Sequence, residues 1–213
     1  MTNLDATHLF SHALSAEPDR LHFAAHSHHL WPDATRAAHE RAWLDAAERA
    51  DEKWGGIFGE VYPAAQANVA QVLGVSDPGQ VAFAANTHDL FVRLISALPA
   101  SRSSRPMLVL STDAEFHSFT RQMRRFRESD RVLWETVPVE PFATLPERFE
   151  AAARGGSWDL VFSSHVFFSS GHAFDEVFDI LAALPNETVC VVDAYHGFFA
   201  LPTDFGPYAD RLY

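Results

Sequence analysis

Short apolar runs alternate with helix-length amphipathic stretches along most of this chain of 213 residues. A run rich in Val, Leu and Ile predicts a buried strand, and amphipathic stretches of about ten residues between such runs predict covering helices. The strands are predicted at residues 81–84, 107–110, 132–137, 160–162 and 189–192. The intervening helices are predicted at residues 89–98, 118–127, 145–153 and 174–184. This alternation predicts the α/β class, with a mostly parallel sheet flanked by helices.

The residues before the first predicted strand have a helical pattern with one interruption. Helices are expected at residues 5–14, 33–54 and 62–73, with an extended piece at 21–23 and a loop at 25–29. Gly55 and Gly56 are expected to end the second helix and Gly74 the third, because glycine commonly follows a helix. We expect an N-terminal helical segment at residues 1–20 and one α/β domain at residues 21–213.

Composition limits the class of protein. With 47% hydrophobic residues the chain can bury a core, which excludes disordered and fibrous proteins. A net charge of −12 argues against nucleic-acid binding. The one arginine cluster is more typical of a solvated helix end than of an anion site; it comprises Arg121, Arg124, Arg125 and Arg127. No apolar run reaches the roughly 20 residues of a membrane span, and no signal-like pattern opens the chain, so we expect a cytoplasmic protein without membrane contact.

Polar and aromatic residues follow four of the predicted strands, at the edge where open parallel sheets bind ligands. Asp193 directly ends the last apolar run, which contains the single cysteine, Cys190, as an expected core residue. A buried carboxylate needs a positive or donating partner, and a protonated pyridine nitrogen is one such partner. The other loops carry Asn86, Thr87 and His88, then Phe116 and His117, and then Ser170 before Gly171. The convergence of these loops indicates a ligand site more strongly than any single loop does.

Two of the loops also have purely structural interpretations. Asn86 or Thr87 can cap the following helix, or the free amides at the helix start and the Thr87 hydroxyl can bind a phosphate monoester. Phe116 or His117 can stack on a heteroaromatic ring, or either can pack beneath its own loop. Both interpretations remain open at the level of the sequence.

On these residues the chain resembles the class V aminotransferase family of fold-type I enzymes, which use pyridoxal 5′-phosphate (PLP), and within it the kynureninases and cysteine desulfurases. The resemblance runs from about Leu21 to the end and is most specific at Asp193-Ala-Tyr-His196. It implies that Asp193 binds the pyridine nitrogen and that His196 lies near the phenolic oxygen. It also implies a phosphate site at Thr87 with Asn86 and His88, ring stacking by Phe116 or its neighbour His117, and a cofactor contact from the loop of Ser170.

The resemblance also implies the biological setting of the complete protein. We expect a PLP-dependent transferase, lyase or hydrolase that forms a homodimer and acts on a small amino-acid substrate, without nucleic-acid or membrane partners. Hydrolytic carbon–carbon cleavage of the kynureninase type, transamination and desulfuration remain open.

The chain departs from the family in two places. Phe167 and Phe168 stand where relatives have Asn, ahead of Ser170 and Gly171. The family's Schiff-base lysine follows the pyridine-binding Asp by roughly two dozen residues, which falls beyond Tyr213, while the single lysine here is Lys53. We therefore expect an incomplete PLP-transferase large domain without its Schiff-base lysine, its remaining strands and its C-terminal small domain. We expect the 213-residue chain itself to be catalytically inactive.

Histidines near the amino terminus support a rival enzyme class. The cluster comprises His22, His26, His28 and His29, and imidazoles suit zinc, so a metal-dependent hydrolase is one alternative. The spacing matches no standard metal site, and we expect no metal. In the family this segment skirts the substrate pocket, which implies substrate-facing roles for His26 and His28, and a plain surface loop is equally compatible. A non-catalytic or split module of the same fold is the remaining alternative.

Overall fold

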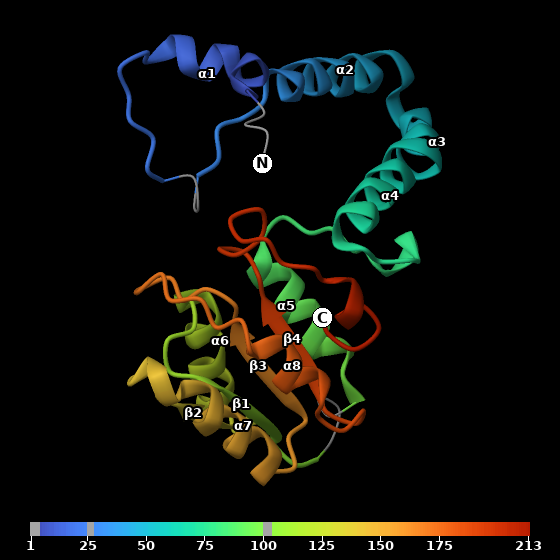
Figure 1. Cartoon of the computed structure of the whole chain (residues 1–213). Helices are drawn as coiled ribbons and strands as arrows, with labels where there is room; N and C mark the ends of the chain where they lie inside the picture. The colour runs from blue at the N-terminus through green and yellow to red at the C-terminus, as the bar shows by residue number, and fades with distance from the viewer. Residues whose placement is uncertain (1–4, 25–27, 100–103) are drawn as a thin grey trace. The chain divides into compact units, whose positions relative to one another are not determined.

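The computed structural model describes residues 5–24, 28–99 and 104–213 (Figure 1). The chain forms two compact units, Met1–Val69 and Ala70–Tyr213, which we call the N-terminal and C-terminal units. Among the described residues, no helix is both long and apolar enough to cross a lipid bilayer.

The N-terminal unit is helical. Its helices are η1 (Thr7–Phe10), α1 (Ser11–Ala16), α2 (Asp33–Arg49), η2 (Ala50–Glu52), α3 (Lys53–Gly56), the π-helical η3 (Ile57–Val61) and the first two turns of α4 (Tyr62–Leu73). No described residue before Ala70 is buried, and Trp31 and Trp43 are 70% and 71% exposed.

The expected helix end at Gly55 and Gly56 is wrong. Gly56 keeps right-handed helical angles (φ −68°, ψ −40°), and helical structure continues through η3 into α4. Glycine ends a helix by adopting positive φ, and without that conformation it only weakens one. The long helix instead ends at Arg49, where Ala50 has φ 46°. The expected end at Gly74 is confirmed, because Gly74 follows α4 with φ 69°.

The C-terminal unit is a parallel sheet covered by helices. Its elements are η4 (Pro78–Gln80), α5 (Thr87–Ala97), β1 (Met107–Thr112), α6 (His117–Glu128), β2 (Val132–Val137), η6 (Phe142–Thr144), α7 (Leu145–Gly155), β3 (Leu160–Ser164), α8 (Val177–Ala182), β4 (Val189–Asp193) and η7 (Gly206–Tyr208). The four strands pair in the order β2-β1-β3-β4, and every pairing is parallel. This confirms the predicted α/β class.

Two predicted elements are corrected. Residues 81–84 form no strand, because Val81 donates its N–H to Pro78 O at 3.0 Å and closes the η4 turn rather than pairing with the sheet. The helix predicted at 174–184 is shortened to α8, because Phe174 donates its N–H to His165 O at 2.8 Å and remains part of the loop after β3.

Side chains alternate across the sheet and supply two cores. Val109 and Leu160 pair in register and pack with α5 and α6 on one face, where Phe91 and Phe119 belong to the same cluster. The neighbouring strand positions pack with α7 and α8 on the other face (Figure 1). Along β1 and β3 nearly every residue is buried, so the polar groups that these two inner strands offer to solvent lie beyond their ends, in the loops.

The outer edge of β4 is also paired where the described chain ends. Tyr213 donates its N–H to Cys190 O and accepts a bond from Val192 N, both at 2.9 Å. This is the hydrogen-bond pattern of parallel strands. Tyr213 therefore extends the parallel pairing of the sheet beyond β4.

Replacing Leu160 by Ala in the full chain should lower the free energy of unfolding by about 2–5 kcal/mol, because Leu160 is fully buried in a central strand. Urea unfolding followed by circular dichroism measures this loss. The matched control is Leu133→Ala in the edge strand β2, where Leu133 is 56% exposed and the expected change is within about 0.5 kcal/mol. Equal losses for the two variants would contradict the described sheet.

Candidate functional site

Asp193 is the last residue of β4 and lies at the carboxyl edge of the sheet. Its side chain is half-buried, and Oδ1 accepts a bond from Tyr195 N at 3.0 Å. Burial raises the pKa of this carboxyl, while the Tyr195 N–H and the nearby His196 act in the opposite direction. No lysine or arginine among the described residues forms an ion pair with it. Asp193 is therefore a carboxylate that can accept a cationic or donating partner.

Glu115 is a second carboxyl at the same edge, in the loop between β1 and α6, and only 7% of it is exposed. Oε1 accepts a bond from Thr112 Oγ1 at 2.7 Å, and Oε2 accepts bonds from Ser164 N at 2.9 Å and Ser164 Oγ at 2.6 Å. Burial and, to a smaller extent, the charge of Asp193 raise the pKa of Glu115 to about 7, while these hydrogen bonds act in the opposite direction. The sequence did not single out Glu115, although its place just after a strand is a signal that it shares with Asp193.

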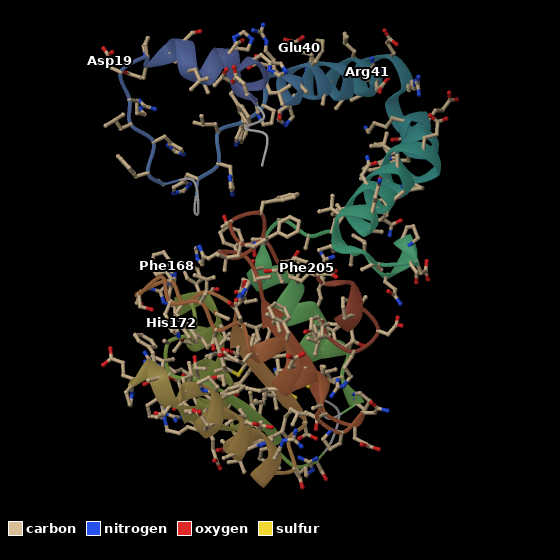
Figure 2. All side chains as sticks on the ribbon, in the orientation of Figure 1. Asp19, Glu40, Arg41, Phe168, His172 and Phe205 are labelled. Atoms are coloured by element: carbon tan, nitrogen blue, oxygen red, sulfur yellow. The ribbon has the colours of Figure 1, made fainter. Side chains whose placement is uncertain are left out.

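An aromatic cluster formed by Phe116, Phe168 and His196 joins three loops at this edge. The ring centroids of Phe116 and Phe168 are 5.2 Å apart, those of Phe168 and His196 5.5 Å, and those of Phe116 and His196 6.3 Å. His117 packs against Phe116 at 4.0 Å. Phe168 lies on the loop after β3, which also carries His172 (Figure 2). The cluster thus brings together the predicted residues Phe116, His117 and His196. It also includes Phe168, one of the two phenylalanines at which the chain departs from the family pattern.

The N-terminal end of α5 is capped by Asn86, whose Oδ1 accepts a bond from Asp89 N at 2.9 Å. This confirms Asn86 as the capping residue. Thr87 begins the helix half-buried and His88 is exposed. In Figure 1 the beginning of α5 and the end of β4 lie at the same end of the sheet. Phosphate binding by Asn86, Thr87 and His88 stays a prediction, supported by the positive end of an 11-residue helix.

The remaining predicted residues have different settings. Ser170 is exposed, and its Oγ accepts a bond from His172 N at 3.2 Å within the loop after β3. His28 is exposed in the N-terminal unit, where its carbonyl contacts His22 Nε2 at 2.8 Å. His26 lies outside the described residues. Among the described residues, no three His, Cys, Asp or Glu side chains gather in a way that could hold a metal ion.

His165 is a fully buried histidine that connects the ends of β3 and β4, and the sequence pattern did not reveal it. Its N–H donates to Asp193 O at 3.0 Å, and its Nε2 lies 2.8 Å from Asp175 Oδ1. Gly197, in the turn after Asp193, lies directly against the imidazole, so that a Cβ there would overlap Nδ1. His165 therefore supports the turn that carries His196.

Gly197→Ala should destabilise the folded chain by about 1–3 kcal/mol, because the added methyl group overlaps the His165 ring. Urea unfolding of the full chain measures this change. The control is Gly155→Ala at the end of α7, where nothing lies within 4 Å of the added Cβ and stability should not fall. A Gly197→Ala chain as stable as the control would show that the turn does not rest on His165.

Glu115 should make stability depend on pH. Its pKa is about 7 in the folded chain and near the ordinary value of 4.5 when unfolded, so between these two pH values the folded state holds an extra proton. The free energy of unfolding should therefore fall as pH rises from about 4.5 to 7. In Glu115→Gln this fall should shrink by up to about 3 kcal/mol. Urea unfolding at a series of pH values tests this, and identical profiles for the two chains would exclude a buried, titrating Glu115.

Solved structures share the fold of this chain at low sequence identity. A mutant of C-DES with glycine covalently linked to its PLP cofactor superposes with a TM-score of 0.75 at 17% identity, over 94% of this chain and 52% of that one. The cysteine desulfurase CsdA from Escherichia coli gives 0.62 at 16%, over 84% and 46%. Histidinol-phosphate aminotransferase from Sinorhizobium meliloti, in complex with PLP, gives 0.56 at 18%, over 75% and 39%.

These likenesses establish the fold. The sequence itself matches no protein-family model and no curated protein. The chain spans about half the length of the first of these structures, 52%. It therefore has the parallel, helix-flanked architecture of the PLP-transferase fold, over a length that corresponds to about half of such a protein.

Proposed function

We propose that this chain forms the cofactor-binding part of a PLP-dependent enzyme of the class V aminotransferase type, acting on an amino-acid substrate. The observation that carries this proposal is the half-buried Asp193, which among the described residues accepts one hydrogen bond and has no lysine or arginine ion-pair partner. It lies at a strand end next to an aromatic cluster, in a fold shared with proteins that bind PLP. An accepting carboxylate beside aromatic rings fits a flat, cationic ring whose N–H donates.

Asp193 supplies the electrostatic contact in this proposal. PLP, when bound, supplies a pyridine ring that accepts electrons from the substrate while its nitrogen is protonated. Burial raises the pKa of Asp193, and a cation beside it favours the ionised carboxylate. Asp193 then holds the proton on the ring nitrogen.

The aromatic cluster positions and shields the ring. Phe116 provides the stacking surface, with His117 packed behind it, and His196 approaches from the turn after β4 toward the phenolic oxygen. Phe168 lies between these two loops and excludes water from one side. We propose in addition that the α5 end with Asn86, Thr87 and His88 binds the phosphate, and that Ser170 contacts the cofactor. His26 and His28 are proposed to face the substrate.

The covalent lysine is proposed to come from outside these residues. The single lysine, Lys53, belongs to the N-terminal unit, and none follows Ala70. The pairing of Tyr213 beside β4 supports a further parallel strand that leads to the lysine. On this proposal the 213-residue chain binds the cofactor noncovalently and does not turn over amino acids.

The reaction type, the cellular location and the oligomeric state are proposed from the residue match alone. The Asp193-to-His196 sequence supports a kynureninase-like or aminotransferase reaction in the complete protein. We propose a cytoplasmic homodimer for that protein.

Asp193→Asn should weaken binding of pyridoxamine 5′-phosphate to the full chain by about tenfold to a hundredfold, because the charge-assisted bond to the ring nitrogen is lost. Pyridoxamine 5′-phosphate is the suitable probe because it carries the same ring and phosphate but cannot react with Lys53. Isothermal titration calorimetry measures the dissociation constants.

The matched control is Asp210→Asn, at an exposed aspartate of the same unit, which should leave the affinity unchanged. Equal affinities for the Asp193→Asn and Asp210→Asn chains would remove Asp193 from the site. A wild-type chain that does not bind the probe would overturn the proposed function.

A further inference from the structure

Resting on the proposed function, we propose that Glu115 is a positioning residue of the cofactor site: its carboxyl bridges the β1–α6 loop to the end of β3, and so fixes the Phe116 ring relative to Asp193. Glu115 does not touch the ring in this account. It acts through the residues on either side of the bridge.

The bridge connects the two strands next to the site. On one side Glu115 is held by Thr112, the last residue of β1, and it immediately precedes Phe116. On the other side it accepts two bonds from Ser164, which pairs in register with Asp193. A movement of the loop that carries Phe116 would break all three bonds within a buried region.

The main chain of Glu115 also fixes the start of α6. Its carbonyl accepts a bond from Thr120 Oγ1 at 3.1 Å, and the same hydroxyl lies 3.2 Å from Phe116 O. The backbone is therefore held by hydrogen bonds at Glu115, just before Phe116, and at Phe116 itself. This leaves the ring facing His196 and Phe168.

Glu115 also adds a titrating charge beside the site. The ionisable groups on the segments that the bridge joins are Asp113 and His117 on its own loop and helix, His165 directly after Ser164, and Asp193 and His196 at the end of β4. Of these, Asp193 raises the pKa of Glu115, which burial places at about 7. Deprotonation near neutral pH therefore brings a second negative charge close to the carboxylate that is proposed to pair with the cationic ring.

Two substitutions separate the bridge from the charge. Glu115→Gln retains an oxygen that accepts from Ser164 and an amide that donates to Thr112 Oγ1, but it cannot ionise. Glu115→Ala removes the bridge and the charge together. Ser164→Ala removes one bond and retains the Ser164 N–H donor, and it serves as a milder variant if Glu115→Ala does not fold.

The first measurement uses the full chain without ligand. Carboxyl ¹³C NMR should show Glu115 titrating near pH 7 in the wild type and at lower pH in Asp193→Asn. Hydrogen exchange of the Ser164 amide should be slow in the wild type and in Glu115→Gln, and at least about tenfold faster in Glu115→Ala. A Ser164 amide that exchanges equally slowly in Glu115→Ala overturns the bridge, and a Glu115 titration unchanged by Asp193→Asn overturns the coupling of the two carboxyls.

The second measurement adds pyridoxamine 5′-phosphate to the same proteins. Glu115→Ala should bind it about tenfold more weakly than the wild type, with Ser164→Ala in between and Glu115→Gln close to wild type at pH 6. Between pH 6 and 8 the affinities of wild type and Glu115→Gln should diverge, because only the wild type gains the second charge. His117 and His196 are present in both chains, so the difference isolates Glu115.

The two proposals fail in distinguishable ways. If the wild type does not bind pyridoxamine 5′-phosphate, the proposed function fails, while the exchange and titration measurements still decide whether the bridge exists. If the wild type binds and Glu115→Ala binds equally well, Glu115 has no positioning role and the present inference is wrong. If Glu115→Gln follows the wild-type pH profile, the effect of the Glu115 charge on the site is overturned.

Discussion

Two carboxyl groups at one edge of a parallel sheet constrain the structure around them. Glu115 is almost entirely buried and accepts three hydrogen bonds from Thr112 and Ser164. Within the described residues, Asp193 is half-buried, accepts one hydrogen bond from Tyr195 N and has no lysine or arginine ion-pair partner. Burial opposes the charge on both groups, and their mutual repulsion adds to that cost. On the proposed function, a cationic ligand beside Asp193 lowers the electrostatic cost of the two carboxyl groups.

The fold provides this edge through its central strand. β3 places Ser164 against Glu115 on one side, while the following residue, His165, holds the carbonyl of Asp193 on the other. Gly197 then packs on the His165 ring, so the turn that carries His196 is supported from below. The loops after three strands are thereby tied together by short-range contacts. A flat aromatic surface and a carboxylate result at the edge where parallel sheets generally bind ligands.

Hydrophobic patterning was sufficient to predict most of the sheet and its helices. β2 has the predicted bounds, 132–137, whereas β1 and β3 each continue for two further polar residues, because Ser163 and Ser164 and their β1 counterparts are buried despite their polarity. The apolar run 81–84 resembled a strand, but its first amide, Val81 N–H, donates to Pro78 O within a tight turn. The presence of Gly55 and Gly56 could not show that helical structure continues past them, since the decisive property is backbone conformation.

The candidate site was predictable in part for the same reason. Asp193, Phe116 and His196 could be found from their positions after apolar runs. Glu115 shares such a position, but its bridge to Ser164 could not be predicted, and neither could the contact of His165 with Asp175, because these partners are distant in sequence or unremarkable in type. The most direct test of the account is the ¹⁵N chemical shift of the ring nitrogen of labelled pyridoxamine 5′-phosphate bound to the chain at pH 8. The account predicts a protonated nitrogen in the wild type and a neutral one in Asp193→Asn; a neutral nitrogen in the wild type would contradict it.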